Sequence, residues 1–482
     1  MPATVSRIRP RTRRIAVAAI PFLLLAACSS GGSKVGSGTT SPGGATSPTT
    51  AAASLAGQCP NGAVAQSSQQ PIQITLWHSM TQANLKTLVT LTDQFNASHP
   101  DIHVNLVNQT SYIDTLTKYK ATLGGGPRPD LVQIQDVDQQ LMIDTKSVLP
   151  VQACFEAKHL DTSDFVPRAI SYYTVRGVDY SIPFAMSNPV LYYNKAAFQK
   201  AGLDPNKPPK TLDELRQDAQ QIVSSGADKY GIALKNDPWH LEEWSAMAGA
   251  LYANNGNGRD KRATAVEFGG ATGQQIYSWI SGMARDKLAE STTSNGFDNL
   301  FAVANKVAAM TIDTSAALGT IFDVLGSGQY KDIQLGVAPL PGPVAGGPTI
   351  QAGSSLFVIS GTSPAREEAA FTFAEWLSEG PQQAVWSAGT GYVPVRTSAT
   401  TQPVLQQAWT ARPQLRIAYD QILSGANTQA AQGPVIGDME GVRTAVENAE
   451  TSLFQGADPT STMQKLVSSA NSVISDYESR VS

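Results

Sequence analysis

The carboxylates and hydroxyls of this 482-residue chain do not form a pattern typical of a hydrolase. Glycoside hydrolysis needs two carboxylates flanking the scissile bond, and acyl transfer needs a nucleophile beside a base. Glu242 and Glu243 are adjacent, so on a helix they point in different directions. Gly-x-Ser-x-Gly does not occur, and Gly353-Ser354-Ser355 fails at its ending. We predict a protein that is not an enzyme, with a cell-surface hydrolase such as a glycosidase as the alternative.

The histidines do not predict a metal site. His99 and His103 are the two that lie close in sequence, and their spacing would suit a metal on a helix. Pro100 and Asp101 instead predict a turn leading into a strand, where residues four apart lie too far from each other to share an ion easily. The Gly-rich segment 124–127 lacks the Gly-Lys-Ser/Thr ending of a phosphate loop. We therefore predict neither a metal nor a cofactor.

The N-terminus carries the features of an export signal. Five arginines within 7–14 precede an almost wholly apolar run, 15–25, which is too short to span a bilayer. Leu25-Ala26-Ala27 followed by Cys28 resembles the lipobox of bacterial lipoproteins. The resemblance implies a signal peptide over 1–27, cleavage before Cys28 and a lipid on its sulfur. An ordinary signal peptide with an accidental cysteine is the alternative.

The next segment predicts a flexible tether. Residues 29–54 are rich in Gly, Ser, Thr, Ala and Pro, a composition that cannot bury enough surface to offset its ordering entropy. We place the tether at 28–57 and expect an extracytoplasmic protein that is attached to the cell membrane through its N-terminal lipid.

The two remaining cysteines, Cys59 and Cys154, lie beyond this tether. In an oxidising exterior, an isolated pair most simply forms one disulfide. Two buried, inert thiols are the alternative.

The length and charge of the chain limit the number of domains and the class of partner. About 410 to 420 residues remain to fold after processing, which exceeds a single core and predicts two domains. The net charge of −4 and the absence of a basic patch argue against a nucleic-acid partner.

The apolar periodicity predicts an α/β fold. Strands are expected at 72–77, 102–107 and 131–134, and helices at 84–98 and 112–123. This alternation is typical of a mostly parallel sheet with helices on its faces. Farther along, the pattern predicts helices at 211–224, 239–251, 273–286 and 297–304, strands at 307–312, 333–337 and 354–359, and helices from 364 onward.

Several segments in order resemble one family, the extracellular solute-binding proteins of bacterial ABC importers, in the maltose-binding-like group. These segments are 76–80, 95–100, 129–133, 191–195, 309–311 and 390–395. Segments 200–211 and 390–392 look most like the glycerol-3-phosphate and glycerophosphodiester binders.

The resemblance implies two α/β lobes, a hinge that the chain crosses more than once, and a ligand cleft between the lobes. We expect an N-lobe of 58–185 and 336–356 and a C-lobe of 186–335 and 357–482. Crossings are expected near 183–189, 334–339 and 353–359. Closure around a ligand would then be a hinge motion.

The resemblance also implies eight cleft residues, each with a structural alternative. Asp136 is the leading polar anchor, because a carboxylate can accept two ligand hydroxyls, and a solvated loop acid is its alternative. Asp138 is close enough to substitute for it. Of Trp239 and Trp244, which match an aromatic floor, Trp239 is the better candidate, and at least one of the pair is expected in the core. The others, with turn, cap or core roles as alternatives, are Tyr112, Ser187, Thr314, Ser315, Gly353 and Tyr392.

One departure from the family bears on the ligand. Where the glycerol-3-phosphate binders place an arginine for the phosphate, this chain has Val435, and Arg443 matches a different family arginine. Arginine is the residue suited to bidentate phosphate recognition, so its loss puts phosphate in doubt. We expect a small polar solute, either a sugar or a glycerophosphodiester. We interpret the protein as a monomer that delivers this solute to a membrane ABC permease, with a solute sensor as an alternative.

Overall fold

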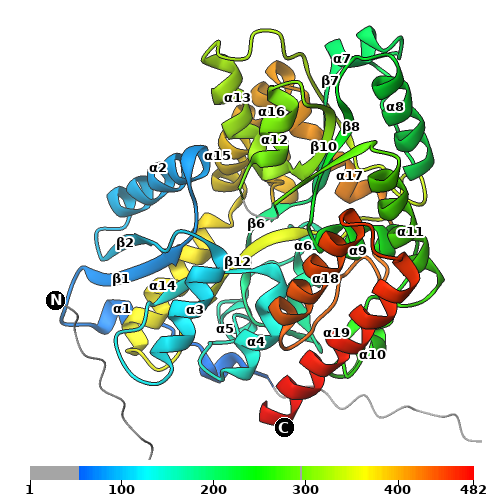
Figure 1. Ribbon diagram of the computed structural model, residues 1–482. Coiled ribbons are helices and arrows are strands. Elements are labelled where there is room, and N and C mark those ends of the chain that lie inside the picture. The colour runs from blue at the N-terminus through cyan, green and yellow to red at the C-terminus, as the bar shows by residue number, and fades with distance from the viewer. Residues whose placement is uncertain (1–53, 294–295, 482) are drawn as a thin grey trace, which may run out of the picture. The chain divides into compact units, whose positions relative to one another are not determined.

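The computed structural model describes residues 54–293 and 296–481 (Figure 1). The predicted signal peptide, Cys28 and most of the tether lie outside these residues. Two five-stranded mixed sheets organise the described chain, and we call the parts built on them the first and the second lobe.

The first sheet has the strand order β2-β1-β3-β12-β6. Strands β2, β1 and β3 are parallel, and β12 is antiparallel to both β3 and β6. Its strands are β1 (Ile72–His78), β2 (Ile102–Asn108), β3 (Leu131–Gln135), β6 (Ile182–Ser187) and β12 (Ala352–Val358). The elements around it are η1 (Ala56–Gln58), α1 (Ala63–Gln66), α2 (Gln82–Ser98), α3 (Tyr112–Thr122), η2 (Asp136–Asp138), α4 (Gln139–Asp144), α5 (Gln152–Ala157), α6 (Pro167–Tyr173), β4 (Thr174–Val175), β5 (Val178–Asp179), α14 (Pro364–Leu377), α15 (Gly380–Thr390) and η4 (Thr397–Thr401).

The second sheet has the order β11-β7-β10-β8-β9. Strands β10, β8 and β9 are parallel, while β7 is antiparallel to β10 and β11. Its strands are β7 (Pro189–Asn194), β8 (Tyr230–Lys235), β9 (Ala289–Thr292), β10 (Ala308–Thr314) and β11 (Leu335–Pro339). The remaining elements are α7 (Lys195–Lys200), α8 (Leu212–Ser224), α9 (Trp239–Met247), α10 (Asn254–Asn257), α11 (Ala271–Arg285), α12 (Asp298–Ala304), η3 (Ser315–Ala317), α13 (Leu318–Gly326), α16 (Pro403–Ala411), α17 (Gln414–Ser424), α18 (Met439–Phe454) and α19 (Pro459–Val481).

The sequence positions the principal elements through ordinary local signals. Leu88, Leu91 and Phe95 recur at helical spacing along α2 and are fully buried. The Thr211 side chain accepts a hydrogen bond from the Glu214 amide at 3.1 Å, which caps α8. The predicted helix 239–251 ends earlier, at Met247, because the chain turns at Gly249, whose φ is +73°.

The chain crosses between the sheets three times. It first crosses at Asn188, between β6 and β7, within the expected segment. The second crossing is residues 340–351, because 335–339 is a strand of the second sheet and 352–358 a strand of the first. The third runs through 391–413, from α15 to α17, which contacts β7 and β11.

The lobe boundaries therefore differ from those expected from the sequence. The expected C-lobe, 357–482, includes α14 and α15, but α14 packs on strands β1, β3, β6 and β12 and α15 packs on α2. The reason is the short link after β12, which returns the chain to the same sheet, where Phe371 and Phe373 become fully buried. Conversely, all but the first residue of β11 falls within the expected N-lobe range, but the strand belongs to the second sheet.

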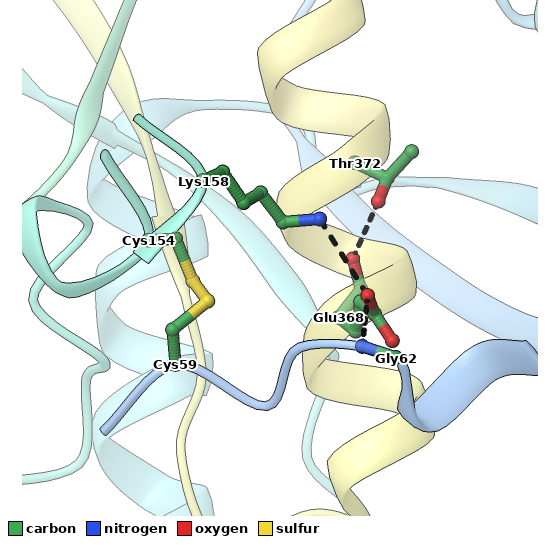
Figure 2. Close-up of a disulfide and its surroundings, with 6 residues drawn as sticks. All are labelled: Cys59, Gly62, Cys154, Lys158, Glu368 and Thr372. Carbon is green, nitrogen blue, oxygen red and sulfur yellow. Dashed lines mark hydrogen bonds and ion pairs between the residues drawn. A yellow bond between two sulfur atoms is a disulfide. The ribbon is translucent and has the colours of Figure 1, made fainter. Parts of the chain in front are cut away.

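The predicted disulfide is confirmed: Cys59 is bonded to Cys154, 95 residues farther along the chain. Figure 2 shows that Glu368 of α14 lies beside it. The Glu368 carboxylate accepts hydrogen bonds from the amides of Gly62 and Val64, both at 2.8 Å, and lies 3.5 Å from Lys158 Nζ. The start of the described chain is thus fastened to the first lobe by one covalent bond and one buried carboxylate.

Candidate functional site

A cavity of about 420 Å³ is lined by residues of both lobes. The ends of β1, β3, β6, β8 and β10 and the start of antiparallel β12 meet there, so each strand places its next residues at one opening. Seven of the eight predicted cleft residues line it: Tyr112, Asp136, Ser187, Trp239, Thr314, Gly353 and Tyr392. Ser315, Asp138 and Val435 are not among the lining residues.

On the first-lobe wall, two tyrosine hydroxyls meet. The Tyr112 hydroxyl lies 3.3 Å from those of Tyr392 and Ser354. Tyr392 is held in place by stacking on Trp386, with ring centroids 5.2 Å apart. Burial raises the pKa of both tyrosines above their ordinary value, so both hydroxyls stay neutral at physiological pH. This wall offers uncharged donors and acceptors to a solute.

Asp136 begins η2, directly after β3, and is 4% exposed. Its carboxylate accepts hydrogen bonds from the Tyr172 hydroxyl at 2.9 Å and from the Gly353 amide at 3.2 Å. Burial raises its pKa to about 6, although Arg443 and the Tyr172 hydrogen bond act in the opposite direction. Asp136 therefore combines a structural role with its place in the cavity.

Gly353 is required at its position in β12. Its φ is +115°, and a Cβ there would collide with the Ala185 carbonyl of the neighbouring strand β6. The same geometry directs its amide to Asp136. The close approach at Gly353 is thus accounted for by packing of β12 against β6, whereas the structural alternative expected from the sequence was a turn at a strand end.

The second-lobe wall is charged. Lys235 Nζ, at the end of β8, lies 3.0 Å from Asp313 Oδ2, at the end of β10. Burial lowers the pKa of Lys235, but the carboxylates of Asp313 and Asp237 more than offset this, and the pKa lies above its ordinary value. The amide of Thr314 and the side chain of Asn299 also donate to Asp313.

A second ion pair lies where α18 reaches the cavity. Arg443 donates from Nε and Nη2 to the two carboxylate oxygens of Glu242, at 2.8 and 2.7 Å. Glu242 is 3% exposed, and its neighbour Glu243 accepts from the Ile350 amide at 2.8 Å. The two adjacent glutamates thus hold different partners, which matches the prediction that they do not act as a pair.

The aromatic residues of α9 separate into two roles. Trp239 is partly exposed and lines the cavity. Trp244 is fully buried, stacks on His240 and donates to the Pro341 carbonyl at 3.0 Å, as expected for a core residue.

Sequence reasoning missed four charged cavity residues: Lys235, Asp237, Asp313 and Arg443. Asp313 directly follows the predicted strand 307–312, and that position was an available signal. Lys235 ends a strand that was not predicted. Arg443 matches a family arginine other than the one absent at Val435, and that match does not by itself predict a place in the cavity. The Val435 side chain is itself buried, and its amide donates to the Asn257 carbonyl.

The comparison with protein families determines the family to which the chain belongs. Residues 90–415 match the family described as bacterial extracellular solute-binding protein. The chain belongs to this family. Curated relatives include the sn-glycerol-3-phosphate-binding periplasmic protein UgpB of Pectobacterium atrosepticum, 30% identical over 421 residues that cover 85% of this chain and 93% of the relative. UgpB of Salmonella typhimurium is 30% identical over 415 residues, covering 84% and 93%.

Solved structures share the fold of this solute-binding protein. UgpB from Mycobacterium tuberculosis in complex with glycerophosphocholine has a TM-score of 0.71 and 23% identity, covering 84% of this chain and 99% of that one. The GacH receptor of Streptomyces glaucescens, also studied with acarbose, has a TM-score of 0.70 and 21% identity over the same shares. The expected α/β, two-lobe solute-binding fold is confirmed, and the family is extracytoplasmic.

Proposed function

We propose that this protein is the lipid-anchored substrate-binding subunit of an ABC importer and that it passes a small polar solute to the membrane permease. The cavity is within the size range of ligand sites, and residues of both lobes surround it, as a hinge-closing binding protein requires. Family membership supports the importer role. The sequence 25–28 supports the anchor. Within the described ranges, no helix is long and apolar enough to cross a membrane.

The charge balance of the cavity carries our proposal for the solute. Its lining holds two cations, Lys235 and Arg443, against three carboxylates, Asp136, Asp237 and Asp313. Both cations are already paired with buried carboxylates, at 3.0 and 2.7 Å. A phosphate monoester would bring more negative charge into this lining without meeting a free cation. The solute is therefore a sugar, or a glycerophosphodiester whose head group carries a balancing cation.

Trp239 and the neighbouring carboxylate of Asp237, which both line the cavity, suit both solute classes. Aromatic faces pack on sugar C–H surfaces and attract quaternary ammonium groups through cation–π interactions. Asp237, whose carboxylate accepts from the Trp239 amide at 3.0 Å, would lie beside such a cation. Glycerol 3-phosphate is the second candidate, because the curated relatives are named for it.

A thermal-shift panel on the chain from Ser54 onward tests the proposal. It contains glycerophosphocholine, glycerol 3-phosphate, and neutral mono- and disaccharides. A ligand at about 100 times its dissociation constant stabilises the protein by about 2.7 kcal/mol. A shift with a sugar or with glycerophosphocholine, and none with glycerol 3-phosphate, is expected. A shift with glycerol 3-phosphate alone would overturn the charge argument.

A further inference from the structure

A second, apolar cavity of about 120 Å³ opens beside the polar one. We call it the groove. Helices α12 and α13 and strand β11 form most of it, and its lining is dominated by large hydrocarbon and aromatic side chains. These are Tyr192, Phe297, Leu300, Phe301, Val303, Ile321, Val324, Leu325, Tyr330, Ile333 and Leu335.

The groove adjoins the polar cavity. Gln82, Phe297, Ala317 and Thr320 line both spaces. A solute held in the cavity therefore lies within a few side chains of the groove. This proximity distinguishes the groove from an isolated apolar patch on an outer face.

The groove side chains are left only partly covered. Leu300, Ile321 and Leu335 pack with one side against the buried core cluster that contains Tyr192 and Leu318, and they are half-buried, while Phe301 is 48% exposed. Apolar side chains left open together in a recess are typical of binding sites. A cavity of 150 Å³ lined by Leu, Ile and Phe binds benzene, so this volume suits a short alkyl chain or a single ring.

We propose that the groove binds an apolar arm of the solute whose polar part occupies the cavity. The solute class is then an amphiphile: a sugar or glycerophosphodiester head that bears a short acyl or alkyl chain, or one ring. The inference rests on the proposed function, because the head must sit in the cavity for the arm to reach the groove.

Two series of probes with matched heads test it by calorimetry. One series runs from methyl to hexyl β-D-glucoside, and the other from glycerophosphocholine to its 1-hexanoyl ester, all below their micelle concentrations. Each buried methylene strengthens binding about fourfold. For the head that binds, affinity should rise by about that factor per carbon and level off when the groove is full. Affinity that stays flat or falls with chain length overturns the inference.

Substitutions test whether the dependence of affinity on chain length arises in the groove. Ala304 lines the groove near the end of α12, and Ala302, on the same helix, does not. Ala304→Phe should abolish the dependence on chain length and leave affinity for the unsubstituted head unchanged, whereas Ala302→Phe should keep the dependence. Val324→Asp, on α13, should have the same effect as Ala304→Phe through charge rather than volume. A chain-length dependence that survives both groove variants overturns the assignment of the site.

A probe without a polar head separates this inference from the proposed function. Benzene, followed by calorimetry, should bind the parent protein, and this binding should be lost in Ala304→Phe but not in Ala302→Phe. If neither head series binds but benzene does, the groove stands and the solute head was wrongly assigned. If neither benzene nor any chain binds, the groove is not a site.

Discussion

On the first-lobe wall of the cavity, the neutral hydroxyls of Tyr112 and Tyr392 lie 3.3 Å apart, whereas the second-lobe wall holds Lys235 at 3.0 Å from Asp313. The first wall can donate to or accept from almost any hydroxylated solute. The second wall has charges whose partners are already in place, so it discriminates by the charge that a solute brings. We infer that the first lobe supplies general polar contacts and that the second lobe determines the charge class of the solute.

The largest expected effect comes from breaking the buried pair Arg443–Glu242. Arg443→Met leaves Glu242, which is 3% exposed, without its cation, and we expect a loss of about 3–5 kcal/mol in the free energy of unfolding. Urea unfolding measures it. The double variant Arg443→Met/Glu242→Gln should recover most of the loss. A single variant as stable as the parent would show that the charged wall is not held together by this pair.

Among the described residues, the first lobe, unlike the second, has a covalent fastening, the Cys59–Cys154 disulfide. Replacing Cys59 and Cys154 by serine should lower the free energy of unfolding by about 2–4 kcal/mol, because the unfolded chain regains the entropy of a 95-residue loop. Solute affinity should stay within about threefold of the parent, since neither cysteine lines the cavity. In the unfolded, unreduced parent, a thiol reagent should label neither cysteine.

A large drop in solute affinity in this double serine variant would contradict the view that the two regions are independent. It would mean that the fastened N-terminal segment helps to set the shape of the first wall.

Asp136 tests the comparison of the two walls, because it is a carboxylic acid on the otherwise neutral first-lobe wall. Its folded pKa, about 6, lies above its ordinary value of 3.8, so between these pH values the folded state binds more protons than the unfolded state. Its contribution to stability must fall as pH rises through this window, by at most about 3 kcal/mol at 1.4 kcal/mol per pKa unit.

Asp136→Asn removes that contribution. Relative to the parent, the ligand-free variant should gain stability between pH 4 and pH 7, as measured by urea unfolding at both values. Affinity for a hydroxylated solute should rise with pH in the parent and stay level in the variant. A constant stability difference between the two proteins at both pH values would mean that Asp136 does not titrate in this range.

The sequence predicted the first lobe better than the second, for a physical reason. Strands 72–77, 102–107 and 131–134 alternate with amphipathic helices, and the cavity residues Tyr112 and Asp136 lie in the segments that follow two of these strands. In the second lobe, Lys235, Asp313 and Arg443 come from segments far apart in sequence. Their pairing depends on how β8, β10 and α18 meet, which no local period encodes.

The smallest expected effect separates two adjacent residues that were predicted together. Thr314 lines the cavity, and its hydroxyl accepts from the Ala316 amide at 3.2 Å, whereas the Ser315 hydroxyl is buried and has no hydrogen-bond partner among the described residues. Ser315→Ala should change affinity less than twofold and leave stability unchanged or slightly higher, because it removes an unpaired polar group. Thr314→Ala should lower stability by about 1 kcal/mol through loss of the cap. If Ser315→Ala instead weakened binding tenfold in a calorimetric titration, its hydroxyl would have to reach the solute in the ligand-bound form, and the second wall would contribute a neutral contact as well as its charges.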